Sequence, residues 1–305
     1  DLDNEEQFAT LLSVNPEDIK EIKVLKDAAA TAIWGSKGAN GVLEITTRRG
    51  VMGKTKINFS YRFTGAWSPE GLNMLNGDGY TMMMKEAYFN PQQSPASSNI
   101  VELNYDQSRP MYYHNFNKNT DWVDAVNQFG QTHNYYVTLT GGGEKARFRI
   151  SGGYDHQTGT IIKQEMDRFS TRMVLDYYVS DRILFSTNFA LSYTDNHRNW
   201  DGSSTSSILG KAYSAMPNMS IYEYDQYGIP TGDFYKMLPT AKEDNETPDG
   251  YSSKYLSDMK NNGNPVAIAH RAFNNQSTYR INPQFNLRYK LLGKDDESHQ
   301  LDLNA

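Results

Sequence analysis

An alternation of apolar and polar residues with a period of two runs through most of the chain after Gly50. It constrains the fold more than any other feature of the sequence. In "TYRINPQFNLRYKLL", residues 278–292, Ile281, Phe285 and Leu287 alternate with polar side chains. Successive side chains of a strand point to opposite faces, so this pattern predicts strands with one apolar face. The same pattern recurs at residues 54–65, 134–141, 146–154, 169–179, 183–193 and 299–305. The sequence therefore predicts a mostly β, antiparallel chain of about seven strands.

The connections between these strands alternate between long and short. Two long segments cover residues 66–131 and 196–276, whereas "GGGEK", "VSDR" and "GKDDES" are tight turns. Short turns at one end and long loops at the other are typical of an up-and-down outer-membrane β-barrel. The pattern predicts that the short turns are periplasmic and that both long loops are extracellular.

A soluble or surface-attached β-sandwich, such as a carbohydrate-binding module, is the alternative, because its strands also alternate apolar and polar residues. Two features favour the barrel. Loops of this length are uncommon in compact domains, and Tyr or Phe residues lie near strand ends, as they do in the aromatic girdles of membrane barrels. Both architectures remain open on pattern alone.

Composition narrows the classes of protein. The 305 residues carry a net charge of −6, so no basic surface for nucleic acid is expected. Cysteine is absent, which rules out disulfides and thiolate metal sites within the chain. The sequence contains no apolar run of about 18 residues, so it predicts no transmembrane helix. A β-barrel, however, crosses lipid without such a helix.

The segment 21–50 predicts a strand, a helical turn, a glycine-rich turn and a second strand. Gly35, Gly38 and Gly41 do not form a phosphate cradle, because they follow the helical turn instead of preceding it. The six histidines lack metal-binding spacing, and no nucleophile motif is present. We therefore expect no catalytic residue, no metal site and no cofactor, and no enzymatic activity.

Aromatic residues are concentrated in the two long loops. Flat rings with a polar tip suit sugar faces and protein partners, although they can also simply pack a loop into a compact cap. The candidate ligand or lid contacts are Trp67, Tyr112, Tyr113, Trp122, Trp200, Tyr222 and Tyr224.

The segment "NPEDIKEIKVLKDAAATAIWGSKGANGVLEITTRRG" resembles the end of the plug domain in the SusC/RagA family of TonB-linked outer-membrane transporters. Trp34 stands where the family usually has Tyr, and Lys37 where it has Arg. Farther along, "DWVDAVNQFGQTHNYYVTLTGGGEKARFRISGGYDHQTGTI" is similar to the first barrel hairpin of that family. The plug motif, with an expected structural role, comprises Asp27, Gly35, Gly38, Asn40 and Gly41.

The resemblance implies an internal part of such a transporter. Residues 1–53 would be the C-terminal part of the plug, and residues 54–305 the N-terminal part of a transmembrane barrel of about 22 strands. It further implies import of oligosaccharides or peptides across the bacterial outer membrane. The implied partners are a SusD-like surface lipoprotein, TonB acting through a region upstream of this chain, and outer-membrane lipid.

The resemblance also assigns the two faces of the strands. Five arginines alternate with the apolar residues, and each would cost about 2–4 kcal/mol if it faced lipid at the bilayer midplane. We therefore expect them to face the barrel lumen. They are Arg147, Arg149, Arg172, Arg280 and Arg288.

Overall fold

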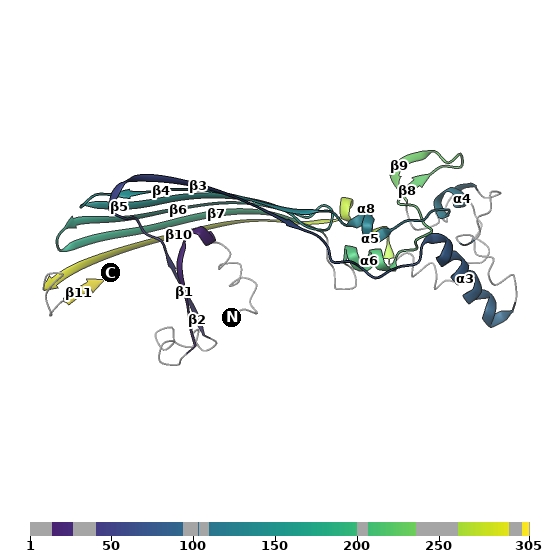
Figure 1. Cartoon of the computed structure of the whole chain (residues 1–305), viewed down its shortest axis with the longest axis horizontal. Helices are drawn as coiled ribbons and strands as arrows, with labels where there is room; N and C mark the ends of the chain where they lie inside the picture. Colours follow the sequence, from purple (N-terminus) through teal and green to yellow (C-terminus); the bar gives the residue numbers. More distant parts are fainter. Residues whose placement is uncertain are drawn as a thin grey trace.

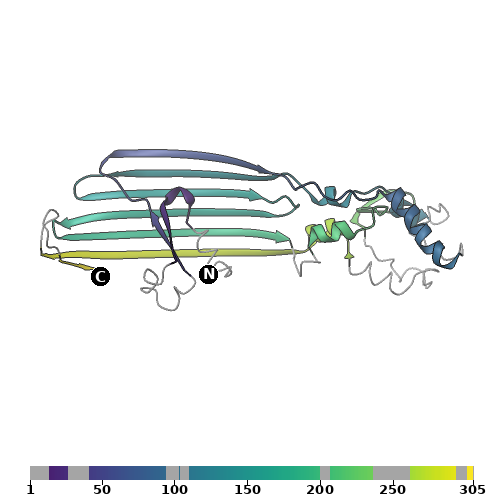
Figure 2. The ribbon, with the colours of Figure 1, turned by 60° about the horizontal axis from the view of Figure 1, so that its bottom comes forward.

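The computed structural model describes residues 14–26, 41–93, 103, 110–199, 207–235, 262–292 and 301–304. Its main element is one seven-stranded antiparallel sheet, here called the wall sheet, with the order β11-β10-β7-β6-β5-β4-β3. Its strands are β3 (Gly53–Ala66), β4 (Gly130–Gly142), β5 (Ala146–Thr158), β6 (Glu165–Ser180), β7 (Ile183–Asn199), β10 (Phe273–Leu292) and β11 (Leu301–Asn304). Strands that follow one another in the wall sheet also lie next to one another in space, which confirms the predicted up-and-down arrangement (Figure 2).

A small hairpin precedes the wall sheet. The 3-10 turn η1 (Pro16–Asp18) leads into β1 (Ile19–Leu25), which pairs with β2 (Val42–Thr47). This N-terminal hairpin lies on the concave side of the curved wall sheet (Figure 1). β3 begins at Gly53, close to the predicted plug boundary. The division into a plug and a barrel domain at that point stays a prediction.

The two long connections build a helical cap at one end of the wall sheet (Figure 1). The cap contains the hairpin of β8 (Tyr222–Tyr224) and β9 (Pro230–Phe234). Its helices are α3 (Gly77–Gln92), α4 (Pro110–Phe116), α5 (Trp122–Val126), α6 (Ile208–Ser214) and α8 (Pro265–Arg271). Side chains cap several of these short helices: Asn264 accepts hydrogen bonds from two backbone amides at the start of α8, and Asp121 caps α5.

None of the helices in the described part of the chain is long and apolar enough to cross a membrane.

The two faces of the wall sheet differ as the period-two pattern predicts. Ile57, Phe59 and Phe285 are 71, 68 and 66% exposed on the outward face, whereas Ser151 and Arg172 on the other face are buried. Among the described residues, no second sheet covers the apolar face. This single-layer arrangement does not support a β-sandwich.

The apolar face carries one aromatic residue on each of six neighbouring strands, in direct cross-strand register. We call these residues the aromatic row: Tyr61, Tyr135, Tyr154, Phe169, Tyr193 and Tyr279. Aromatic girdles of this kind mark the interface between hydrocarbon and headgroups in membrane barrels. The row crosses the strands near the end that carries the helical cap.

Candidate functional site

The contact between the N-terminal hairpin and the wall sheet is built around one buried carboxylate. Asp18 is 3% exposed. It accepts hydrogen bonds from the hydroxyl of Tyr136 at 2.5 Å and from the hydroxyl of Ser151 at 2.8 Å. The guanidinium nitrogen Nε of Arg149 lies 3.4 Å from Asp18 Oδ1, and that of Arg172 lies 3.9 Å from Oδ2. We call these five residues the hairpin anchor.

Local sequence explains how Asp18 reaches the wall sheet. Asn15 caps η1 by accepting a hydrogen bond from the backbone amide of Glu17, and Pro16 suits the first position of the turn. The backbone amide of Asp18 donates a hydrogen bond to the carbonyl of Asn15 at 2.9 Å. The carbonyl of Asp18 accepts a hydrogen bond from the amide of Arg48 at 2.8 Å. The "NPED" turn thus fixes the backbone on both sides of the anchoring carboxylate.

Charge is only partly balanced within the hairpin anchor, which contains two guanidinium groups and one carboxylate. The Arg149 and Arg172 side chains are only 12 and 10% exposed, so their charges need partners that replace water. Asp18 provides one, and Arg172 also donates to the amide oxygen of Asn188 at 3.0 Å. Removing one partner of such a buried pair is costly, because the remaining charge is left uncompensated.

Two more exposed ion pairs surround the hairpin anchor. Arg49 lies 2.8 Å from Asp176, and Arg62 lies 2.9 Å from Glu17. Both arginines are largely exposed, and exposed pairs add little stability. These pairs orient the hairpin, while the buried hairpin anchor holds it.

The link from the N-terminal hairpin to β3 passes very close to the wall sheet. A Cβ atom added at Gly50 would lie only 2.5 Å from the backbone nitrogen of Phe148. Backbone atoms cannot move aside as a flexible side chain can, so this position requires glycine. The approach fixes the point where the chain passes from the hairpin into the sheet.

The predicted plug motif is only partly described. Gly41 has a φ of +94°, and a Cβ there would lie 3.2 Å from the carbonyl oxygen of Leu25. A left-handed backbone beside a carbonyl explains a glycine at this position. Asp27, Gly35, Gly38 and Asn40 lie outside the described residues.

Trp122 lies largely inside the helical cap. It was expected among the possible ligand contacts, but it is only 3% exposed, and its indole nitrogen donates to the carbonyl of Met216 at 2.8 Å. It belongs to the core of the helical cap with Val126, Met219 and Val266. Trp122 therefore packs the cap core, and because it is also among the residues that line the groove described below, ligand contact by Trp122 stays a prediction.

The other candidate aromatic residues have different surroundings. Trp67 is 76% exposed beside Phe129, and Tyr222 is half exposed and stacked on Phe234. The ammonium of Lys118 lies 4.1 Å from the Tyr224 ring. Tyr113 contacts His114 edge-on. Trp200 and the side chain of Tyr112 lie outside the described residues. Ligand contact by these residues stays a prediction.

A groove in the helical cap was missed by the sequence analysis. Its volume is about 830 Å³, and its walls include Tyr80, Met83, Asp121 and Tyr213. Polar and apolar groups line it together, so it could hold a ligand or a loop of a partner. No local signal predicts it, because its walls come from segments far apart in the sequence.

Partial loss of solvent lowers the pKa of two cap residues. The ammonium of Lys211 is buried and donates to the carbonyl of Asn262 at 2.8 Å, and desolvation lowers the pKa of this lysine. The pKa of His270 is also lowered, first by desolvation and then by the positive charge of Lys163.

The fold and the hairpin anchor define a class of protein. A curved, single-layer antiparallel sheet exposes an apolar face with an aromatic row, and its polar face holds a separate hairpin through buried charges. Such a sheet is typical of the wall of a membrane β-barrel, and a hairpin on its polar face is the arrangement expected of an internal plug.

Comparison with known proteins narrows the class, although no protein-family model matches the chain. TonB-dependent receptor P3 of Formosa agariphila is 26% identical over 215 residues, covering 69% of this chain and 19% of the receptor. TonB-dependent receptor SusC of Bacteroides thetaiotaomicron is 27% identical over 262 residues, covering 84% of this chain and 23% of SusC. The chain thus spans about a fifth of the length of these relatives.

Solved structures show the same fold. The RagAB peptide importer in its closed-closed state matches with a TM-score of 0.62 at 18% identity, covering 94% of this chain and 32% of the solved chain. The structure of the RagAB peptide transporter matches with a TM-score of 0.59 over 97% of this chain. In sequence the chain is similar to part of TonB-dependent receptors such as SusC, and in fold it is similar to part of a chain in the RagAB structures.

Proposed function

We propose that the protein containing this chain imports oligosaccharides or peptides across the bacterial outer membrane, driven by TonB. The hairpin anchor is the observation that supports this most directly. A hairpin held against the polar face of the wall sheet would obstruct a lumen, and a buried ion pair resists spontaneous release. Passage of a large solute would then need work on the hairpin, which TonB would supply through an upstream region.

The hairpin anchor sets the scale of that work. Separating Asp18 from Arg149 and Arg172 leaves buried charges without partners, at a cost of about 3–5 kcal/mol. Water that enters as the hairpin moves would lower this cost by solvating the exposed groups. The anchor therefore keeps the path closed at rest, yet a modest pulling force can open it.

The helical cap would lie at the extracellular entrance of the import path. We place a SusD-like lipoprotein over it, with the groove beside Tyr80 and Tyr213 as a contact for substrate or lid. The fold shared with the RagAB peptide importer supports peptide as one substrate class, and oligosaccharide is the second class that the family resemblance implies. Location in the outer membrane, with the apolar face against lipid, belongs to the same proposal.

Uptake by the full-length protein tests this function. Cells that carry it should take up labelled oligosaccharide or peptide only when TonB and the lid lipoprotein are present. Asp18→Asn removes the charge of the hairpin anchor with little change of shape, so it should raise TonB-independent leakage of small solutes. Glu17→Gln removes a largely exposed pair with Arg62 and serves as the matched control, which should leave leakage unchanged.

One outcome of the uptake experiment would contradict the proposal. Absence of binding and uptake for both substrate classes, in a correctly inserted protein with its lid, would contradict the proposed function. If Asp18→Asn does not insert, Tyr136→Phe removes one hydrogen bond of the anchor while keeping all three charged groups, and it should give a smaller leak.

A further inference from the structure

Imidazole and carboxylate groups gather just beyond the aromatic row, on the same outward face of the wall sheet. One step along the strands, His133, His156, Asp167 and Asp195 follow one another in cross-strand register. One step farther, Glu165 lies opposite His197. We call these six residues the imidazole–carboxylate belt. It contains three of the six histidines of the chain.

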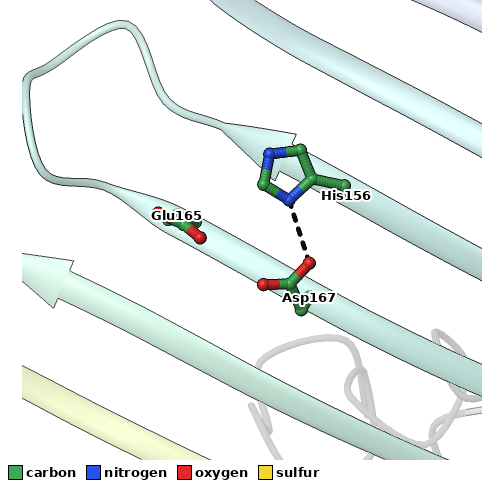
Figure 3. Close-up of side chains that lie close together, drawn as sticks. All are labelled: His156, Glu165 and Asp167. Atoms are coloured by element: carbon green, nitrogen blue, oxygen red, sulfur yellow. Dashed lines mark hydrogen bonds and ion pairs between the residues drawn. The ribbon is translucent and has the colours of Figure 1, made fainter.

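Three members of the belt lie close enough to share one ligand. The donor atoms of His156, Glu165 and Asp167 all lie within 4.8 Å of one another. His156 comes from the end of β5, and both carboxylates come from the start of β6 (Figure 3). The imidazole Nδ1 lies 2.9 Å from Asp167 Oδ1, which also accepts a hydrogen bond from Tyr154 at 2.6 Å. These bonds orient Asp167 toward the imidazole.

The charges of the belt favour a bound cation. Asp167 lies directly opposite Asp195 on the same face, and like charges in that position destabilise a sheet. Among the described ion pairs, these two carboxylates face imidazoles, those of His156 and His197. Three carboxylates gathered on one face create a negative potential that a divalent ion would neutralise.

We propose that His156, Glu165 and Asp167 form a binding site for a divalent transition metal ion, with Zn²⁺ as the best match. Imidazole nitrogen together with carboxylate oxygen suits Zn²⁺, whereas Ca²⁺ and Mg²⁺ prefer oxygen ligands alone. Tetrahedral coordination at about 2.0–2.2 Å brings neighbouring donors to roughly 3.4 Å apart. The exposed Glu165 side chain is free to close this gap. Three protein ligands leave a fourth position for water or a headgroup oxygen.

The site is complete within this chain. β5 and β6 lie inside the wall sheet, flanked by β4 and β7, so strands added beyond its edges would not reach these residues. The metal would join the two strands at the mouth of their connection, at the level where the aromatic row places the headgroups. The proposal is therefore independent of what the transporter carries.

Zinc titration of the full-length protein tests the site. Isothermal titration calorimetry in detergent, after chelator treatment, should show a Zn²⁺ binding event that Glu165→Gln weakens by at least about tenfold and His156→Gln by more. His133→Gln is the matched control from the same register row, and it should change the affinity by less than about threefold. Zinc X-ray absorption should show one imidazole nitrogen among oxygen neighbours.

The outcomes separate clearly. Zinc should raise the thermal stability of the wild-type protein in a saturable manner, and Glu165→Gln should remove that shift. Because Glu165 is exposed, this variant should fold normally. The proposal is overturned if both variants bind Zn²⁺ as the wild-type protein does, or if Ca²⁺ competes equally well. If these variants still transport substrate and bind zinc as the wild-type protein does, the metal site is refuted. The proposed function would be unaffected by that result.

Discussion

The wall sheet and the helical cap place their apolar side chains in opposite ways. The wall sheet leaves Phe59 and Phe285 68 and 66% exposed, whereas the cap encloses Trp122 and Met219 at 3 and 0%. The two regions belong to one chain but are built for different surroundings. The cap buries a cluster of apolar groups in a core of its own, as a protein in water does, while the sheet needs hydrocarbon against one face.

The height of the apolar face agrees with a bilayer. On β10, Tyr279 and Tyr289 bracket the apolar positions, ten residues apart. That spacing is about 34 Å along a strand, and about 25 Å across the membrane at a tilt of about 40°. The aromatic residues thus lie at the two expected interfaces.

The largest effect should come from removing the centre of the cap core. Trp122→Ala creates a cavity and removes one of the hydrogen bonds that the Met216 carbonyl accepts, and it should lower cap stability by about 3–5 kcal/mol. Hydrogen–deuterium exchange should accelerate in α5, α6 and α8, with the amides of β5 and β6 unchanged. Trp67→Ala, at an exposed site, should have little effect. Equal acceleration in the sheet would mean that the two regions are not independent.

A charge on the apolar face should have the next largest effect. Phe285→Arg places a guanidinium near the middle of the apolar band, and this should lower the free energy of unfolding by about 2–4 kcal/mol. Asn286→Arg, one residue along and on the polar face, should cost far less. Denaturant titration of folding into lipid vesicles compares the two variants. Similar losses, or a larger loss for Asn286→Arg, would contradict the assignment of the faces.

A smaller effect is expected at the start of α3. A Cβ at Gly77 would lie 2.0 Å from the carbonyl oxygen of Lys118 and 2.9 Å from the Cα of Asn218. Gly77→Ala should loosen α3 by about 1–3 kcal/mol through overpacking, measured as faster limited proteolysis of α3. Gly143→Ala, where nothing lies within 4 Å, is the control. Equal proteolysis of both variants would argue that α3 does not pack there.

The smallest effect concerns pH. The pKa of His270 is lowered in the folded cap, so the unfolded state binds its proton more readily. Cap stability should be unaffected by this residue above about pH 6.5, the ordinary histidine pKa, and should fall as pH decreases below it. Hydrogen exchange of α8 at pH 7.5 and 5.5 measures this, and His270→Gln should reduce the difference. If α8 became more stable at the lower pH, the predicted direction of the pH dependence would be wrong.

The sequence could predict the wall sheet but not the helical cap, for a physical reason. The faces of a strand depend on alternation between neighbouring residues, so Ile281 and Arg280 are assigned to opposite faces without knowledge of their partners. The cap core instead joins Phe116, Trp122 and Val266 from separate loops. Nothing local distinguishes a buried tryptophan from one that binds a ligand.

The same reasoning explains the site residues. Asp18 lies in a recognisable turn, but its partners Tyr136 and Arg149 are more than a hundred residues away. His156 and Asp167 meet only because β5 and β6 pair in one particular register. The spacing of His156 and Asp167 in the sequence therefore does not predict that their side chains meet.

Paired thiol labelling on β10 tests the central claim most directly. The chain has no cysteine, so Ile281→Cys and Asn282→Cys each introduce a thiol that is unique within it. A fluorophore at each position, in the full-length protein in bilayers, is exposed to brominated lipid and to a water-soluble quencher. We predict strong quenching by brominated lipid at position 281 and little at position 282. Equal quenching by lipid at both positions, or the reverse order, would contradict a sheet with one face in the membrane.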